Sequence, residues 1–351
     1  MSNSNVGLID ADLLDGGTRF PNLALMKISA WHQARGQTTR LLTSYDNLGD
    51  FSSVYISKVF TKTSVPALQK KRNIFRGGTG FYEAEAPPLP DEIEHIKPDY
   101  TLYDAYVAEK IATGARLSNF DYYQNYSIGF TTRGCFRKCA FCVNRKYDRA
   151  VLHSPVGEFY DPRRKYLCLL DDNVFASSQW RDVFAALNDT GRAFQFRQGL
   201  DVRLMTPEKA AVLAASKYHR EIYFAFDRIE DRAQIVRSLQ IYRAECDRPT
   251  RAYVLCGFAS RDRTDIESVF ERIAILISFR VIPYIMRFAS VYDSPLCRLY
   301  SYIAAWCNQP SFFKKTSFGE FCEKRATSEK ARQECCWRDV PKKYLDLRYE
   351  E

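Results

Sequence analysis

Short apolar runs rich in β-branched and aromatic residues recur from about residue 127 onward, each followed by a stretch long enough for a helix. This alternation predicts parallel strands with helices between them. We expect strands at 127–131, 165–170, 193–197, 221–226, 251–256 and 281–286. We expect helices at 177–187, 207–215, 231–246 and 264–278, several of them after a Ser, Thr or Asp that can cap a helix. Six such strands make a partial (β/α)6 barrel.

The first hundred residues carry a different pattern. An apolar strand at 6–9 is followed by a helix at 21–34 and by short strands at 38–42 and 54–57. This order is typical of half of a doubly wound, Rossmann-like α/β domain. We therefore expect an α/β domain over 1–100, a linker over 101–124, the partial barrel over 125–290 and a helical C-terminal segment over 291–351.

Composition and charge narrow the class of protein. The 351 residues hold no apolar run long enough for a bilayer, and the polar N-terminus does not resemble a signal peptide. We expect a cytoplasmic protein without a membrane partner, whose eleven cysteines are reduced thiols or metal ligands. The net charge of +9 favours an anionic substrate such as a nucleotide or nucleic acid, although a solvated basic surface also explains it.

Three cysteines gather in one loop directly after the first barrel strand. The segment Gly134-Cys-Phe-Arg-Lys-Cys-Ala-Phe-Cys142 spaces Cys135, Cys139 and Cys142 as C-x3-C-x2-C. Three thiolates can hold a [4Fe-4S] cluster and leave its fourth iron open to another ligand. The alternative is a zinc site with His153 as a fourth ligand.

This motif, with the aromatic Phe141 before the last cysteine, resembles the signature of the radical S-adenosylmethionine (SAM) superfamily. The resemblance implies that Cys135, Cys139 and Cys142 bind the cluster and that its open iron binds SAM, next to Phe141. In that family one electron from the cluster cleaves SAM to a 5'-deoxyadenosyl radical, which takes a hydrogen atom from the substrate. The resemblance also implies a protein reductant such as flavodoxin or ferredoxin.

The resemblance continues along the barrel and assigns SAM contacts to residues at strand ends. Asp171, Asp172 and Asn173 end the second strand, where the family carries a motif that contacts the methionine amino group; here two acids replace the common glycines.

Further contacts are expected at the ends of the later strands. Arg203 is expected to pair with the SAM carboxylate, and Asp201 or Gln198 with the ribose hydroxyls. The remaining SAM-binding residues expected at strand ends are Asp227, Cys256 and Met286. For each polar residue the alternative is a salt bridge or a helix cap.

The N-terminal domain resembles the cobalamin-binding-type domain that precedes many radical SAM barrels. None of the four histidines stands in the D-x-H-x-x-G loop that commonly ligates cobalt, so we do not expect cobalamin; they are His32, His95, His153 and His219. Asp99-Tyr100-Thr-Leu-Tyr103 and the overall arrangement resemble an uncharacterised radical SAM group of bacteria and phages.

The substrate remains a choice between classes. Basic residues crowd the cysteine loop, and aromatic residues beside it are candidates for stacking on a base. The aromatic candidates are Tyr122, Tyr123, Tyr126 and Phe136. We favour radical modification of a nucleotide or nucleic-acid base, as in phage DNA hypermodification. The alternatives are radical modification of a peptide or small metabolite, and a non-catalytic zinc-binding nucleic-acid protein. A second cluster is a further option, with ligands among Cys297, Cys307, Cys322, Cys335 and Cys336.

Overall fold

The structure is a computed structural model that describes residues 5–68, 72–328 and 335–349. The chain forms two compact units, Met1–Phe194 and Gln195–Glu351, which we describe separately. Over the three described ranges, no helix has both the length and the apolar character that crossing a membrane requires.

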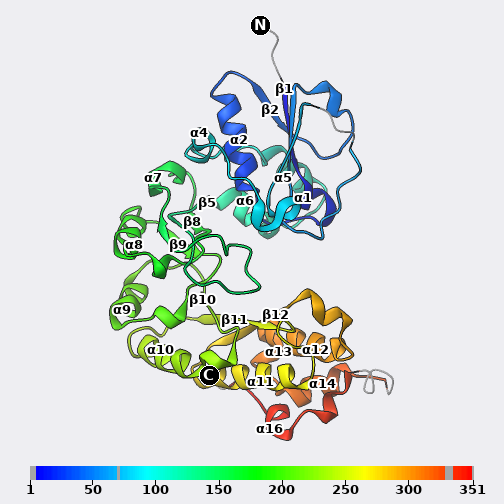
Figure 1. Cartoon of the computed structure of the whole chain (residues 1–351), viewed down its shortest axis with the longest axis vertical. Helices are drawn as coiled ribbons and strands as arrows, with labels where there is room; N and C mark the ends of the chain where they lie inside the picture. The colour runs from blue at the N-terminus through cyan, green and yellow to red at the C-terminus, as the bar shows by residue number, and fades with distance from the viewer. Residues whose placement is uncertain (1–4, 69–71, 329–334, 350–351) are drawn as a thin grey trace. The chain divides into compact units, whose positions relative to one another are not determined.

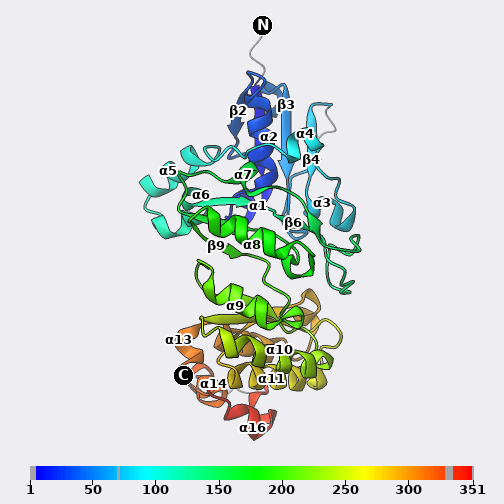
Figure 2. The same ribbon diagram turned by 90° about the vertical axis from the view of Figure 1, so that its left-hand side faces the viewer.

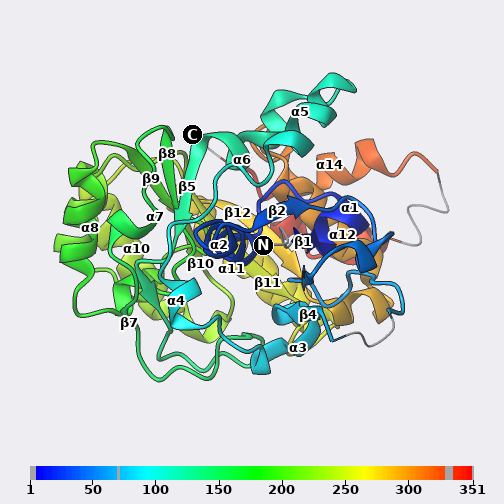
Figure 3. The same ribbon diagram turned by 90° about the horizontal axis from the view of Figure 1, so that it is seen from above.

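The first unit opens with a parallel sheet in the strand order β2-β1-β3-β4. The strands are β1 (Asn5–Asp10), β2 (Thr38–Leu41), β3 (Ser53–Ser57) and β4 (Ile74–Gly77). The associated helices are α1 (Ala11–Gly16), α2 (Leu23–Gln33), α3 (Thr79–Tyr82) and α4 (Asp91–Glu94). Figure 3 shows α2 end-on beside β1 and β2, where Leu25 and Met26 pack with Val6 and Leu8 in one apolar cluster. The three predicted strands and the predicted helix are confirmed, whereas β4 was missed.

The segment after α4 connects the first sheet to the second through two tyrosine hydroxyls. Tyr103 is 3% exposed; its hydroxyl donates to Asp10 Oδ2 (2.9 Å) and accepts from the Asn22 N–H (3.0 Å). Tyr100 is 5% exposed; its hydroxyl accepts from the Ile128 N–H (2.8 Å) and donates to a backbone carbonyl 2.6 Å away. The two side chains, three residues apart, therefore fasten the ends of β1 and α2 to the next sheet.

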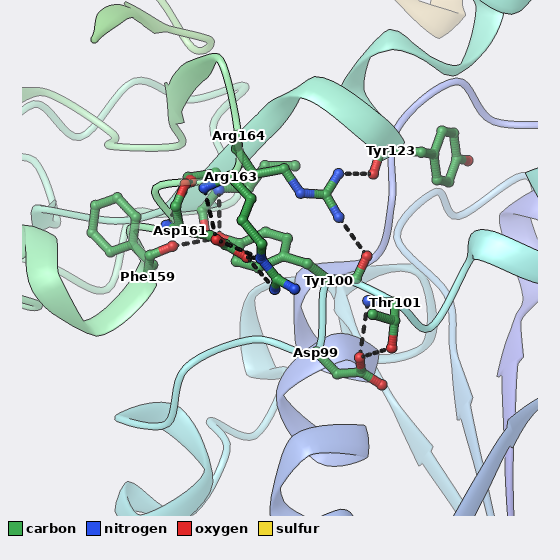
Figure 4. A network of polar contacts seen from close by, with 10 residues as sticks. Asp99, Tyr100, Thr101, Tyr123, Phe159, Asp161, Arg163 and Arg164 are labelled. Carbon is green, nitrogen blue, oxygen red and sulfur yellow. Dashed lines mark hydrogen bonds and ion pairs between the residues drawn. The ribbon is translucent and has the colours of Figure 1, made fainter. Parts of the chain in front are cut away.

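Arg164, which lies just before β8 (Tyr166–Leu169), also binds the backbone of this segment (Figure 4). The Arg164 guanidinium donates to the backbone carbonyls of Tyr123 (2.5 Å) and Tyr100 (2.6 Å). The region that the sequence predicts as a linker is helical, with α5 (Asp104–Ala112) and α6 (Asp121–Asn125).

The second sheet has the order β5-β8-β9 and includes the first three predicted barrel strands. They are β5 (Tyr126–Gly129), β8 (Tyr166–Leu169) and β9 (Ala193–Phe196), and β5 and β8 are parallel. A two-stranded antiparallel hairpin follows β5, formed by β6 (Thr132–Arg133) and β7 (Val151–Leu152). The helices are α7 (Val156–Phe159) and α8 (Trp180–Asp189). Figure 2 shows α8 beside β9, where the Phe184 ring meets the Phe194 ring edge-on.

The second unit contains a parallel sheet in the order β10-β11-β12, followed by helices. Its strands are β10 (Ile222–Ala225), β11 (Thr250–Cys256) and β12 (Ile282–Arg287). Its helices are α9 (Pro207–Ala215), α10 (Arg232–Glu245), α11 (Arg263–Ser278), α12 (Cys297–Asn308), α13 (Pro310–Phe313), α14 (Phe318–Arg325) and α16 (Lys342–Leu345). Figure 1 shows α10, α11 and α12 along one side of this sheet.

All six predicted barrel strands are confirmed, with bounds that shift by one or two residues, and the four predicted helices between them are present. They are parallel-sheet elements of a mixed α/β fold with a helical C-terminal part, as the sequence predicts. The six strands form two separate three-stranded sheets, β5-β8-β9 and β10-β11-β12. The helix predicted at 177–187 is α8, which begins three residues later, at Trp180.

One buried arginine ties the strand ends of the second unit together. Arg272 on α11 is 1% exposed, and its Nη1 lies 3.1, 2.9 and 2.8 Å from the carbonyl oxygens of Phe226, Asp227 and Leu255. These carbonyls belong to the carboxyl ends of β10 and β11, which places a charged group under the rim of the sheet.

Candidate functional site

The cysteine loop spans the residues between β6 and β7, and its two ends approach each other closely. Gly134 has a φ of +94°, and a Cβ there would lie 2.4 Å from the Arg149 carbonyl oxygen. Only glycine fits this close approach without moving the backbone. Within the loop, the Cys142 N–H donates to the Cys139 carbonyl oxygen at 3.0 Å.

The three thiols of the loop are partly buried, and the sulfurs of Cys135 and Cys142 accept hydrogen bonds from N–H groups. Cys135 Sγ accepts from the Arg137 N–H (3.4 Å) and from Asn173 Nδ2 (3.3 Å). Cys142 Sγ accepts from the Asn144 N–H at 3.4 Å, and burial raises the pKa of this thiol. Donors aimed at sulfur stabilise thiolate ligands and tune the potential of an iron–sulfur cluster. The donor set therefore fits a cluster bound by Cys135, Cys139 and Cys142.

His153, the zinc ligand considered from the sequence, points its ring at other groups. Its Nδ1 lies 3.0 Å from Ser154 Oγ and its Nε2 lies 3.5 Å from Glu94 Oε1. Burial, followed by the charge of Arg133, lowers the pKa of His153 to about 4. In residues 5–68, 72–328 and 335–349, no three His, Cys, Asp or Glu side chains converge as ligands of a single metal ion.

Asp171, Asp172 and Asn173, which follow Leu170 just after β8, contact the cysteine loop and the segment that leads into it. Asp171 is fully buried, and its carboxylate accepts from the N–H and hydroxyl groups of both Thr131 and Thr132 at 2.5 to 2.9 Å. Burial raises its pKa. Asp172 accepts from the Gly134 N–H and from an Asn144 amide, and Asn173 donates to Cys135 as described above. The contact of Asp171, Asp172 and Asn173 with SAM stays a prediction, as does that of the half-buried Phe141.

In the second unit, Arg203 and Asp201 meet in an ion pair. Arg203 Nε lies 2.7 Å from Asp201 Oδ1, and Arg203 Nη1 lies 2.8 Å from Asp231 Oδ2. The salt bridge that the sequence analysis gave as the alternative to SAM binding is therefore present at Arg203. A SAM carboxylate bound there would share the guanidinium with Asp201 and Asp231. The contact with Asp231, 28 residues away, was not foreseen.

The other predicted SAM-binding residues of this unit differ in exposure. Asp227 Oδ1 accepts from the Leu255 N–H at 3.1 Å, and Cys256 is 1% exposed, with a thiol whose pKa burial raises to about 12. Gln198 is exposed, and Met286 is 45% exposed. Their roles in SAM binding stay predictions.

Two of the aromatic residues expected to stack on a base are core residues. Tyr123 and Tyr126 are 4% and 0% exposed, and the Tyr126 ring stacks on Tyr122 with centroids 4.5 Å apart. Their apolar surface is already covered by protein, so the stacking expectation is wrong for these residues. Phe136, in the loop itself, is 43% exposed.

The cysteines considered for a second cluster are mostly buried thiols. Cys307, Cys322 and Cys335 are 0% exposed, and burial raises the pKa of each thiol. A buried neutral thiol behaves as a small apolar side chain. The burial of these three thiols therefore gives no support to a second cluster.

The carboxyl edge of the first sheet holds a buried acid that the sequence did not single out. Asp10 ends β1, is 2% exposed, and accepts from Tyr103 and from the Leu13 N–H. Asn22 Nδ2 beside it donates to Ser57 Oγ at 2.8 Å. Burial raises the pKa of Asp10 to about 6.

This raised pKa predicts a pH-dependent difference in stability between the wild type and Asp10→Asn. The folded protein keeps the Asp10 proton at pH values where the unfolded chain has released it, so the carboxyl stabilises the fold at low pH and loses that effect as the pH rises through about 6. Between about pH 4 and about pH 7.5, the free energy of unfolding of the wild type relative to Asp10→Asn should fall by about 2 kcal/mol. Urea unfolding at several pH values measures it, and a constant difference would contradict the prediction.

Comparison with known proteins gives a structural match and no sequence match. No family model matches the chain, and no curated protein matches it. The structure of the radical SAM methyltransferase TsrM from Kitasatospora setae, with cobalamin and a [4Fe-4S] cluster bound, superposes with a TM-score of 0.52 at 14% identity, over 82% of this chain and 75% of that chain. TsrM with tryptophan substrate and a SAM analogue (aza-SAM) gives 0.52 at 13% identity, over 80% and 72%. At such identities the likeness concerns the fold alone: the chain has a mixed α/β fold similar to that of TsrM, and its parallel sheets and helical C-terminal part are those that the sequence predicts.

Proposed function

We propose that this protein is a radical SAM enzyme. The observation that carries the proposal is a loop with three cysteines and N–H donors to two of its sulfurs, in a fold shared with TsrM. Bound by Cys135, Cys139 and Cys142, a [4Fe-4S] cluster would supply the electron that cleaves SAM to a 5'-deoxyadenosyl radical for hydrogen abstraction.

The chain's own residues have three tasks in this proposal. The three cysteines ligate the cluster, and the backbone of Arg137 and the side chain of Asn173 donate hydrogen bonds to a ligating sulfur. In the second unit, Arg203 offers a guanidinium for the SAM carboxylate, while Gln198, Asp201 and Asp227 offer polar atoms for the rest of the cofactor.

For the substrate we favour an anion, and among anions a nucleotide or nucleic-acid base. Support comes from the net charge of +9 and from exposed basic side chains in the cysteine loop, namely Arg145, Lys146 and Arg149. Such a surface attracts phosphate groups. The resemblance to phage proteins, including those that accompany DNA hypermodification, belongs to this proposal, as does a flavodoxin or ferredoxin as reductant.

The second candidate is modification of a peptide or small metabolite. The TsrM structure with tryptophan favours it, because that relative in fold acts on an amino acid. A zinc-binding nucleic-acid protein remains the non-catalytic alternative.

Cobalamin is not part of the proposal for this chain, although TsrM binds it. The sequence has no D-x-H-x-x-G loop, and side chains of the protein itself occupy the edge of the first sheet, where Tyr103 bonds to Asp10 and Asn22. Reconstitution with hydroxocobalamin, followed by gel filtration, tests this: a cobalamin spectrum that travels with the protein contradicts it.

Anaerobic reconstitution with iron and sulfide tests the proposed function. We expect a brown protein with equal iron and sulfide that, once reduced by dithionite or flavodoxin, converts SAM to methionine and 5'-deoxyadenosine. A colourless protein with bound zinc and no SAM cleavage would support the zinc alternative. Deuterated nucleotides and deuterated tryptophan, supplied in turn, separate the substrate classes by which label reaches 5'-deoxyadenosine.

A further inference from the structure

The residues at the end of β8 and those of the cysteine loop are joined by hydrogen bonds at three places. The first is the segment before the loop, where Asp171 accepts four bonds from Thr131 and Thr132. Three of these bonds reach Oδ2 and one reaches Oδ1, so both oxygens of the carboxylate already accept from the segment that leads into the loop. Its burial excludes water from the contact.

The second place joins the two ends of the loop to one carboxylate. Asp172 Oδ2 accepts from the Gly134 N–H at 2.7 Å, just before the first cysteine. Asp172 Oδ1 accepts from Asn144 Nδ2 at 2.5 Å, just after the last cysteine. Because the two partners lie ten residues apart, a single side chain closes the cysteine segment into a ring.

The third place is a ligating sulfur. Asn173 is 4% exposed, and its Nδ2 lies 3.3 Å from Cys135 Sγ. A buried amide donor at a thiolate lowers the charge density on sulfur, and such hydrogen bonds raise the potential of an iron–sulfur cluster.

We propose that Asp171, Asp172 and Asn173 are positioning residues that hold the start, the end and the first thiol of the cysteine loop in place for the cluster. The inference rests on the proposed function, because the loop must bind a cluster for this role to exist. It gives the motif a task other than the contact with the methionine amino group that the family resemblance implies. We call these three residues the loop clasp.

Iron release from the reconstituted holoprotein, without SAM, tests the loop clasp. Outer-shell partners of metal ligands are worth about 10- to 100-fold in metal affinity. We expect Asp172→Asn, which replaces one acceptor by an amide donor, to release iron to a chelator about 10- to 100-fold faster than the wild type. The matched control is Asp182→Asn, an exposed acid on α8, which should release iron at the wild-type rate.

A second pair of variants keeps the test informative if Asp172→Asn does not fold. Asn144→Ala removes the other partner of the same bond and changes a half-buried side chain in the loop. On its own, Asn144→Ala should release iron faster than the wild type. Added to a folded Asp172→Asn, it should not raise the rate further, because Asp172→Asn already disrupts the bond to Asn144. For Asn173→Leu, we expect the reduction potential of the cluster to fall, as measured by a dye-mediated titration followed by electron paramagnetic resonance.

The outcomes separate the loop clasp from the proposed function. A wild-type protein that takes up no cluster overturns the proposed function. A wild-type protein that holds its cluster, with clasp variants that release iron at the wild-type rate but bind SAM at least about tenfold more weakly, overturns the clasp and returns the motif to SAM binding.

Discussion

Replacing Cys139 by alanine should abolish SAM cleavage. The thiol is the middle one of the three proposed ligands, and a loop with two thiolates would leave a second iron of the cluster without a protein ligand. The loss should exceed the about 10- to 100-fold that removal of an outer-shell partner costs, because a direct ligand is removed. The measurements are iron content after anaerobic reconstitution and 5'-deoxyadenosine formed from SAM.

The control for this variant is Cys246→Ala. Cys246 is a buried thiol after α10, outside the loop and in the other unit, so its removal should leave iron content and SAM cleavage unchanged. Full SAM cleavage by Cys139→Ala would refute the assignment of the cluster to this loop.

Replacing Arg272 by methionine should destabilise the second unit by at least about 3 kcal/mol. The change keeps the length of the apolar part but removes the donor to three carbonyl oxygens, one in a buried and two in partly buried contacts, and an orphaned buried acceptor costs about 1 to 3 kcal/mol. It also frees the backbone of Asp227 and Leu255 at the rim. We therefore expect weaker SAM binding in addition to a lower urea midpoint.

The matched control is Arg263→Met on the same helix. Arg263 pairs with Asp339 at 2.8 Å, but both side chains are more than half exposed. Exposed ion pairs contribute about 0 to 1 kcal/mol, so this variant should unfold close to the wild type. Equal destabilisation by the two variants would contradict the role of Arg272.

The strands could be read from the sequence where apolar residues cluster locally. The run that becomes β11 is predicted at 251–256 and found at Thr250–Cys256. By contrast β4 contains one aliphatic residue, Ile74, and ends at a glycine, and its pairing with β3 brings together residues twenty apart. Such a strand exists because of its neighbour and leaves no periodic pattern of its own.

In the candidate site, too, features set by local sequence could be predicted, and features set by distant residues could not. The cysteine spacing is local, so it could be recognised directly. Which partner a polar side chain takes is a matter of distant residues: Asp171 bonds to Thr131, forty positions earlier, and Arg203 bonds to Asp231. The sequence placed these side chains at strand ends but had no means to show that protein groups already occupy their polar atoms.

The paired hydroxyls of Tyr100 and Tyr103 limit how this protein can be dissected. A fragment that begins at residue 125 would retain Ile128 but lose the hydroxyl to which its N–H donates, and a fragment that ends at residue 98 would leave Asp10 and Asn22 without Tyr103. Neither cut produces a piece whose buried polar groups are all satisfied. A graft of the amino-terminal sheet onto another barrel would therefore have to include residues 99–123 and a recipient first strand that accepts the tyrosine.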